Sequence, residues 1–116
     1  LALSAMYAAN HLDSVKAIVT LTESGKTAKL MSRISSGHPI YSLSRHASTL
    51  GQTALYRGVY PVYFDSTKHD QECMIKDALD TLVERGSLVK GDTVILTHGD
   101  KMETVGATNT MKIITV

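Results

Sequence analysis

The chain has 116 residues, of which 43% are hydrophobic and 20% charged, a composition typical of one globular domain. The net charge of +1 and an aromatic fraction of 5% exclude a basic surface interleaved with aromatics, so no nucleic-acid partner is expected. No apolar run approaches the length of a membrane span, so no membrane partner is expected either.

Strands and helices alternate through the first part of the chain. Apolar residues at helical spacing predict a helix in residues 1–11, and an apolar run predicts a strand at about 16–22. A second helix is predicted at about 24–35 and ends before Gly37, which suits a helix C-cap. Ile40–Ser44 follows as a second strand.

A short helix at about 48–57 and a strand at Val59–Phe64 come next. Pro61 lies inside this strand and lacks a backbone N–H group, so the strand is predicted at an edge of the sheet. The residues expected to face inward from the short helix are Leu50, Ala54 and Leu55.

The second part of the chain contains the clearest helix, at about 69–85, and Cys73 is expected to be a small buried residue in it. Thr93–Thr97 reads as a buried parallel strand, followed by a loop over His98–Ala107 and a final strand over Thr108–Val116. The helix is expected to bury a stripe of Ile75, Ala78, Leu79, Leu82 and Val83.

This alternation predicts an α/β fold, a three-layer sandwich with a mostly parallel five-stranded sheet and helices on both faces. Residues 1–116 then form a single domain. The last two strands are joined by a loop too short for a parallel crossover, so the last strand is predicted to pair antiparallel.

The turn after the first strand is the main candidate for binding. A polar segment leads from the strand into a helix, and exposed backbone N–H groups at a helix start suit a phosphate or a carboxylate. Ser24 as a simple helix cap is the alternative. The residues of this turn are Thr22, Glu23, Ser24, Gly25, Lys26 and Thr27.

Three segments are predicted to meet beyond the carboxyl ends of the strands, where ligands bind in such sheets: Thr22–Lys26, Arg45 and the His98–Ala107 loop. Residues 1–57 carry six Lys/Arg and two acidic residues, whereas residues 58–116 carry six and nine, so the half with the turn suits an anionic ligand. No arrangement of residues typical of an active site is found. His98 could act as an acid or base, but a lone histidine at a strand end is expected to be solvated. The histidines and the single cysteine show no metal-ligand spacing, so no metal site is predicted.

Four stretches of the sequence resemble one known family. Residues 17–44 read AIVTLTESGKTAKLMSRISSGHPIYSLS, 54–64 read ALYRGVYPVYF, 90–100 read KGDTVILTHGD and 108–116 read TNTMKIITV. Together they resemble the C-terminal domain of pyruvate kinase over nearly the whole chain. The resemblance implies the allosteric, effector-binding domain of a cytoplasmic glycolytic enzyme. The sequence resembles bacterial members of the family in particular.

The resemblance also implies where chemistry and regulation lie. The parent enzyme transfers phosphate from phosphoenolpyruvate to ADP with Mg2+ and K+, and its catalytic and metal residues belong to a barrel domain outside these residues, so the fragment is expected to be inactive alone and to need no cofactor. The turn Thr22–Thr27 matches the family's effector phosphate loop. The segment His98–Gly106, which includes Gly99 and Lys101, matches the loop that closes over the effector.

Two departures from the family pattern bear on the effector. Glu23 places a negative charge in the phosphate loop, and the closing loop carries Asp100 and Glu103 against the one cation Lys101. These charges disfavour a ligand with two phosphates such as fructose 1,6-bisphosphate. A sugar monophosphate or AMP is the expected effector.

Assembly is the second implied role, because the family forms homotetramers in which C-terminal domains meet. The strand Thr110 to Val116 is apolar and predicted at a sheet edge, where a second copy could pair. A covered edge is the alternative. Two other functions stay open: a stand-alone phosphosugar- or nucleotide-binding module, and a purely structural assembly domain.

Overall fold

The computed structural model describes residues 15–21, 26–33, 37–65, 68, 71–99 and 108–116. Its strands are β1 (Val15–Leu21), β2 (Ile40–Ser44), β3 (Val59–Tyr63), β4 (Thr93–Gly99) and β5 (Thr108–Thr115). Its helices are α2 (Lys26–Ser32), α3 (Ala47–Thr53) and α4 (Gln71–Glu84). The predicted helix in residues 1–11 lies outside the described residues.

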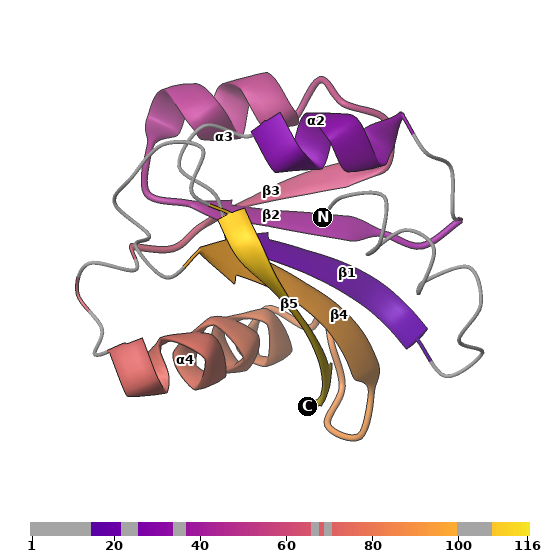
Figure 1. Ribbon diagram of the computed structural model, residues 1–116, viewed down its shortest axis with the longest axis vertical. Coiled ribbons are helices and arrows are strands. Elements are labelled where there is room, and N and C mark those ends of the chain that lie inside the picture. Colours follow the sequence, from indigo (N-terminus) through magenta and orange to yellow (C-terminus); the bar gives the residue numbers. More distant parts are fainter. Residues whose placement is uncertain (1–14, 22–25, 34–36, 66–67, 69–70, 100–107) are drawn as a thin grey trace.

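The strands form one five-stranded sheet in the order β3-β2-β1-β4-β5 (Figure 1). β1 pairs in parallel with β2 and with β4, and β2 pairs in parallel with β3. β5 pairs antiparallel with β4, as its short connection requires. The predicted α/β fold and the antiparallel last strand are therefore confirmed, and Pro61 lies on an edge strand as expected.

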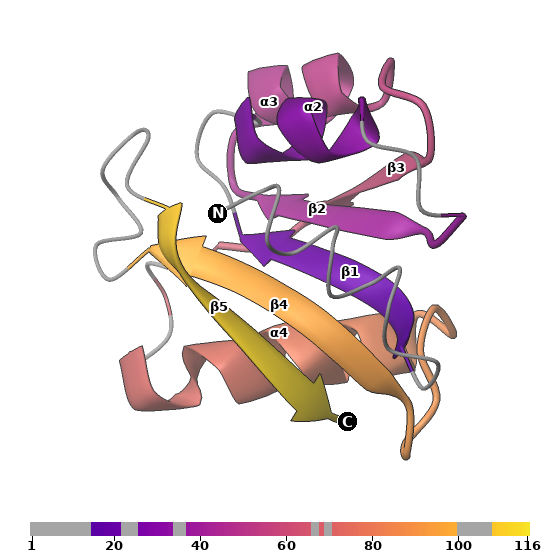
Figure 2. The same ribbon diagram turned by 45° about the vertical axis from the view of Figure 1, so that its right-hand side comes forward.

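Helices cover both faces of the sheet. α2 and α3 lie on one face and α4 lies on the other, which both views of the ribbon show (Figures 1 and 2). The chain runs from β1 through β2 to β3 by way of α2 and α3, and then returns by way of α4 to β4 on the other side of β1. The direction of winding thus reverses between β1 and β4.

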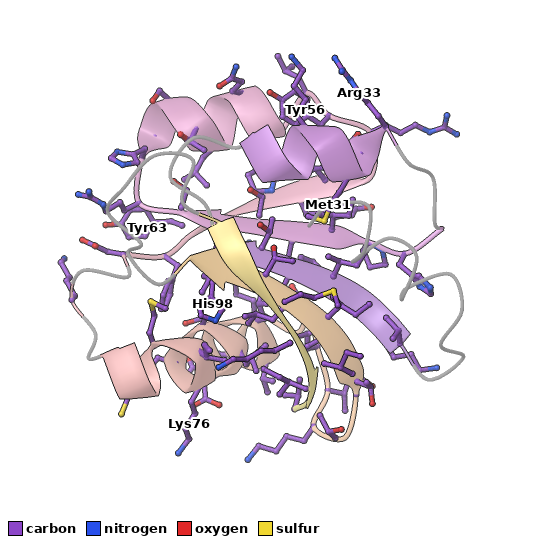
Figure 3. All side chains as sticks on the ribbon, in the orientation of Figure 1. Met31, Arg33, Tyr56, Tyr63, Lys76 and His98 are labelled. Atoms are coloured by element: carbon purple, nitrogen blue, oxygen red, sulfur yellow. The ribbon has the colours of Figure 1, made fainter. Side chains whose placement is uncertain are left out.

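Two apolar clusters hold these layers together. The cluster on the α4 face contains Val19 and Leu96 of the sheet together with Leu82 of α4. The cluster on the α2 face contains Ile18 of β1 and Met31 of α2, both fully buried. Figure 3 shows Met31 between α2 and the sheet. Alternate residues of a strand point to opposite faces, so β1 supplies both clusters from neighbouring positions. The predicted stripe of α4 is confirmed, since its members are buried or packed against the first cluster.

Three predictions about buried side chains were wrong. Ala54 is exposed and Leu55 is 84% exposed, because α3 ends at Thr53 and buries Thr49 and Thr53. The hydroxyl of Thr53 donates a hydrogen bond to the carbonyl oxygen of Leu50 at 3.2 Å. Because this polar group has a partner within the helix, the buried face of α3 can consist of threonines and does not require apolar residues. Cys73 is exposed on α4 and not buried. Within the described residues, no helix combines the length and the apolar character needed to cross a membrane.

We expect replacement of Leu82 by alanine to lower the free energy of unfolding by about 2–5 kcal/mol, because it leaves a cavity between α4 and the sheet. Leu55→Ala removes the same atoms from a side chain that is 84% exposed, and should cost less than about 0.5 kcal/mol. Urea unfolding of both variants measures the difference. Equal losses would contradict the placement of α4 over the core.

Candidate functional site

The carboxyl ends of the four parallel strands define one edge of the sheet, which we call the carboxyl edge. β3 ends there at Tyr63, and the three strands β2, β1 and β4 end at Ser44, Leu21 and Gly99. The registers Leu21↔Leu43 and Thr20↔Thr97 show that the three strands end at nearly the same level. The strands therefore end side by side at one edge of the sheet (Figure 2).

The winding of the sheet reverses between β1 and β4. In open parallel sheets, ligands bind beyond the carboxyl ends of the strands at such a reversal. The strand order therefore indicates the ends of β1 and β4 as the position to consider for a ligand, without reference to a specific motif.

Several predicted site residues do meet at this edge. Lys26 is the first residue of α2, which returns from the end of β1, and Thr27 follows it. Arg45 comes directly after β2, and the segment 98–99 ends β4. Thr22, Glu23, Ser24 and Gly25 lie outside the described residues, as do Lys101 and Gly106.

Arg45 is held at the edge by the turn between β2 and α3. The Oγ atom of Ser44, which is 3% exposed, accepts a hydrogen bond from the backbone N–H group of His46 at 3.1 Å. His46 is the N-cap residue of α3 and has extended backbone angles. Arg45 itself is half-buried, and its Nε atom is enclosed. The turn thus fixes the backbone of Arg45 at the end of the strand.

His98 occupies a different place from the one predicted. β4 extends to Gly99, so His98 and Gly99 belong to the strand and not to a loop. His98 pairs with Thr110 of β5 and is only 8% exposed, so it is not a solvated residue. Because it lies two positions beyond Leu96, its side chain points toward the α4 face, where Figure 3 places it.

The cations of the first half do not all gather at the carboxyl edge. Lys29 is exposed on α2, and Arg33 follows the far end of that helix, where its side chain points away from the sheet (Figure 3). Of the predicted cations, Lys26 and Arg45 are the two that the described backbone brings to this edge. No group of three potential metal ligands occurs among the described residues.

The sequence interpretation missed a set of buried polar groups behind the edge. Thr20, Ser42 and Thr97 are each 0% exposed, and their hydroxyl groups have no hydrogen-bond partner among the described residues. Each directly follows a hydrophobic residue of its strand (Val19, Tyr41 or Leu96), a signal that is visible in the sequence for each strand separately. Their alignment depends on the pairing of the strands, which the sequence pattern alone does not provide.

Comparison with known proteins gives a consistent result. The family model described as "Pyruvate kinase, alpha/beta domain" matches residues 1–114. The chain is 59% identical over 116 residues to pyruvate kinase II of Salmonella typhimurium. It is 53% identical over 116 residues to a pyruvate kinase of Buchnera aphidicola. Both matches cover 100% of this chain but only 24% of each relative. The chain therefore spans about a quarter of the length of these relatives.

The Ser44–His46 hydrogen bond yields a prediction about the turn that carries Arg45. Ser44→Ala should lower the free energy of unfolding by about 1 kcal/mol, because the part-buried N–H group of His46 loses its acceptor. Ser48→Ala alters an exposed serine of α3 and should stay within about 0.5 kcal/mol of the parent. Chemical denaturation compares the two. A Ser44 variant as stable as the parent would show that the turn does not need this bond.

Proposed function

Because the chain belongs to the pyruvate kinase family and matches its alpha/beta domain, we propose that it is the C-terminal regulatory domain of a cytoplasmic, bacterial-type pyruvate kinase. The whole enzyme transfers phosphate from phosphoenolpyruvate to ADP in glycolysis. Mg2+ and K+ act in its barrel domain, outside these residues. The chain itself contributes regulation and assembly.

We propose that regulation begins with a phosphorylated effector bound at the carboxyl edge between β1 and β4. The observation that carries this proposal is the strand order, which reverses its winding at that position and delivers Lys26 and Arg45 to the same edge. A phosphate group suits these cations, since charge-assisted hydrogen bonds are the strong ones. The residues proposed for this site are Thr22, Glu23, Ser24, Gly25, Lys26, Thr27, Arg45, His98, Gly99, Lys101 and Gly106.

The balance of charge supports one phosphate group and not two. Glu23 lies within the phosphate turn, and Asp100 and Glu103 offset Lys101 in the closing loop. A second phosphate would meet these carboxylates at a cost. The position of Arg33 at the far end of α2 adds to this argument, because it removes a further cation from the edge. A sugar monophosphate or AMP is therefore the proposed effector.

Lys26→Ala should weaken binding of ribose 5-phosphate, glucose 6-phosphate or AMP, whichever binds, by about 1.5–3 kcal/mol, or roughly tenfold to a hundredfold. The reason is the loss of a charge-assisted contact. Lys29→Ala is the matched control, because it removes an exposed lysine of the same helix. Isothermal titration calorimetry of the 116-residue chain measures both affinities.

Two results would count against the effector site. Equal affinities of the Lys26 and Lys29 variants would move the phosphate away from the start of α2. No heat and no shift in melting temperature with any of these ligands or with fructose 1,6-bisphosphate would leave the assembly role as the function of the chain.

Self-association is the second function that we propose, and β5 carries it. β5 is the edge strand next to β4, and Ile113 on it is 52% exposed. An edge strand of this kind offers unpaired backbone groups to another chain. Beside it, a groove of about 500 Å³ separates β5 from α4. The groove is lined by Ile75, Lys76, Leu79, Asp80, Lys90, Ile114, Thr115 and Val116.

An apolar groove that continues an open strand edge fits a second copy of the same domain. Pairing of the segment Thr110 to Val116 with its counterpart would bury Ile113, and Asp80 of each copy would meet a lysine of the other, Lys76 or Lys90, across a two-fold axis. This arrangement accords with a homotetrameric parent enzyme.

Ile113→Lys should weaken self-association at least about tenfold, because a charge would have to be desolvated beside the paired strands. Leu55→Lys places the same charge on an apolar residue that is 84% exposed next to α3, on the side of the sheet away from β5, and serves as the control. Analytical ultracentrifugation over a range of concentrations measures the effect. A parent chain that stays monomeric at high concentration would show that β5 alone is not sufficient.

A further inference from the structure

Three buried hydroxyl groups form a continuous row across the middle of the sheet. Thr20 of β1 is in register with Ser42 of β2 on one side and with Thr97 of β4 on the other. We call Ser42, Thr20 and Thr97 the hydroxyl row. Because residues in register on adjacent strands point to the same face, the three side chains are neighbours.

The row faces the helices α2 and α3. Ile18, Ile40 and Ile95 are also in register, and each precedes one member of the row by two positions on its strand. These isoleucines belong to the apolar cluster that includes Ala28 and Met31 of α2. The same face of the sheet therefore changes from isoleucine to hydroxyl residues one step before the carboxyl edge.

Placing hydroxyl groups in this buried position lowers the stability of the fold unless the groups have hydrogen-bond partners. Each residue of the row is 0% exposed, and each hydroxyl lacks a hydrogen-bond partner among the described residues. Burying a hydroxyl group without a partner disfavours folding, and valine would fill the place of threonine with nearly the same shape. Stability alone does not account for three such residues side by side.

Threonines elsewhere in the molecule show the usual solution. The hydroxyl of Thr53 donates to the carbonyl oxygen of Leu50, and that of Thr81 donates to the carbonyl oxygen of Asp77 at 2.9 Å. In a helix, the carbonyl group one turn earlier lies within reach. In the hydroxyl row, the neighbouring carbonyl groups belong to strands that are paired on both sides.

We propose that the hydroxyl row is the polar floor of the ligand site and binds O–H groups. Hydroxyl side chains are neutral and can both donate and accept, so they suit alcohol groups or water and not the phosphate itself. The row lies beneath the ends of β1 and β4, where the effector is proposed to bind. Two sources of O–H groups fit: ordered water, and the hydroxyl groups of a phosphorylated sugar. The second source rests on the proposed effector site.

The test replaces each member with an apolar residue of similar shape, as Thr20→Val, Ser42→Ala and Thr97→Val. The melting temperature is measured for the ligand-free 116-residue chain, and calorimetry gives the affinities for ribose 5-phosphate and for inorganic phosphate. Thr53→Val is the matched control, because it is a fully buried threonine with an identified acceptor in its own helix. Thr20→Ser keeps the hydroxyl group and should keep the parent ratio of the two affinities, whereas the loss of its buried methyl group lowers the melting temperature.

Each source of O–H groups has its own signature. If ordered water binds the row, the apolar variants lower the melting temperature by roughly 4 °C each and leave the ratio of the two affinities unchanged. If sugar hydroxyl groups bind, the affinity for ribose 5-phosphate falls about tenfold while that for inorganic phosphate is retained. Thr53→Val should leave the ratio unchanged in either case.

The proposal is overturned if the apolar variants melt at the same or a higher temperature and keep the parent ratio of affinities. Gains in melting temperature with no change in binding would mean that the hydroxyl groups are simply unsatisfied. A parent chain that binds neither ligand would contradict the effector site. In that case, lower melting temperatures of the apolar variants would show that the hydroxyl row binds water, and equal or higher ones would overturn the proposal.

Discussion

The burial of β1 is the constraint on which the rest of the structure depends. β1 is hydrogen-bonded on both sides by parallel strands, and six of its seven residues are buried. Its alternate side chains supply the two apolar clusters, so α2 must cover one face and α4 the other. A buried polar side chain on such a strand is expected to have a hydrogen-bond partner. The burial of Thr20 therefore raises the question of what its hydroxyl group binds.

The location of the proposed ligand site follows from the same constraint. Because β1 has parallel neighbours on both sides, the chain must leave it in one direction and later return to the other, and the winding reverses at β1 and β4. The ligand site that we propose lies beyond the ends of those strands. Lys26 and Arg45, which the backbone brings to this edge, are the reason for proposing an anionic ligand there.

The sequence was most informative where local pattern and burial agree. Apolar runs located the strands, Pro61 identified an edge, and the periodicity of α4 identified its buried stripe. It failed where a polar residue is buried with a local partner, as at Thr53, since apolar periodicity then assigns the wrong face to α3. It also placed His98 in a loop, because the antiparallel pairing with β5 that extends β4 is a tertiary contact.

Thr53 and Thr20 illustrate why burial has to be considered together with partners. Both are 0% exposed and both are read from the sequence as threonine in a regular element. The hydroxyl of Thr53 is satisfied by its own helix, so its burial is explained by packing against β3 and β2. Thr20 has a strand on each side and two further hydroxyl residues in register. Packing explains a side chain of this shape, but it does not explain why the side chain carries a hydroxyl group without a partner among the described residues. The chemistry of that oxygen atom, and not its location alone, connects the interior of the sheet with the ligand proposed at its edge.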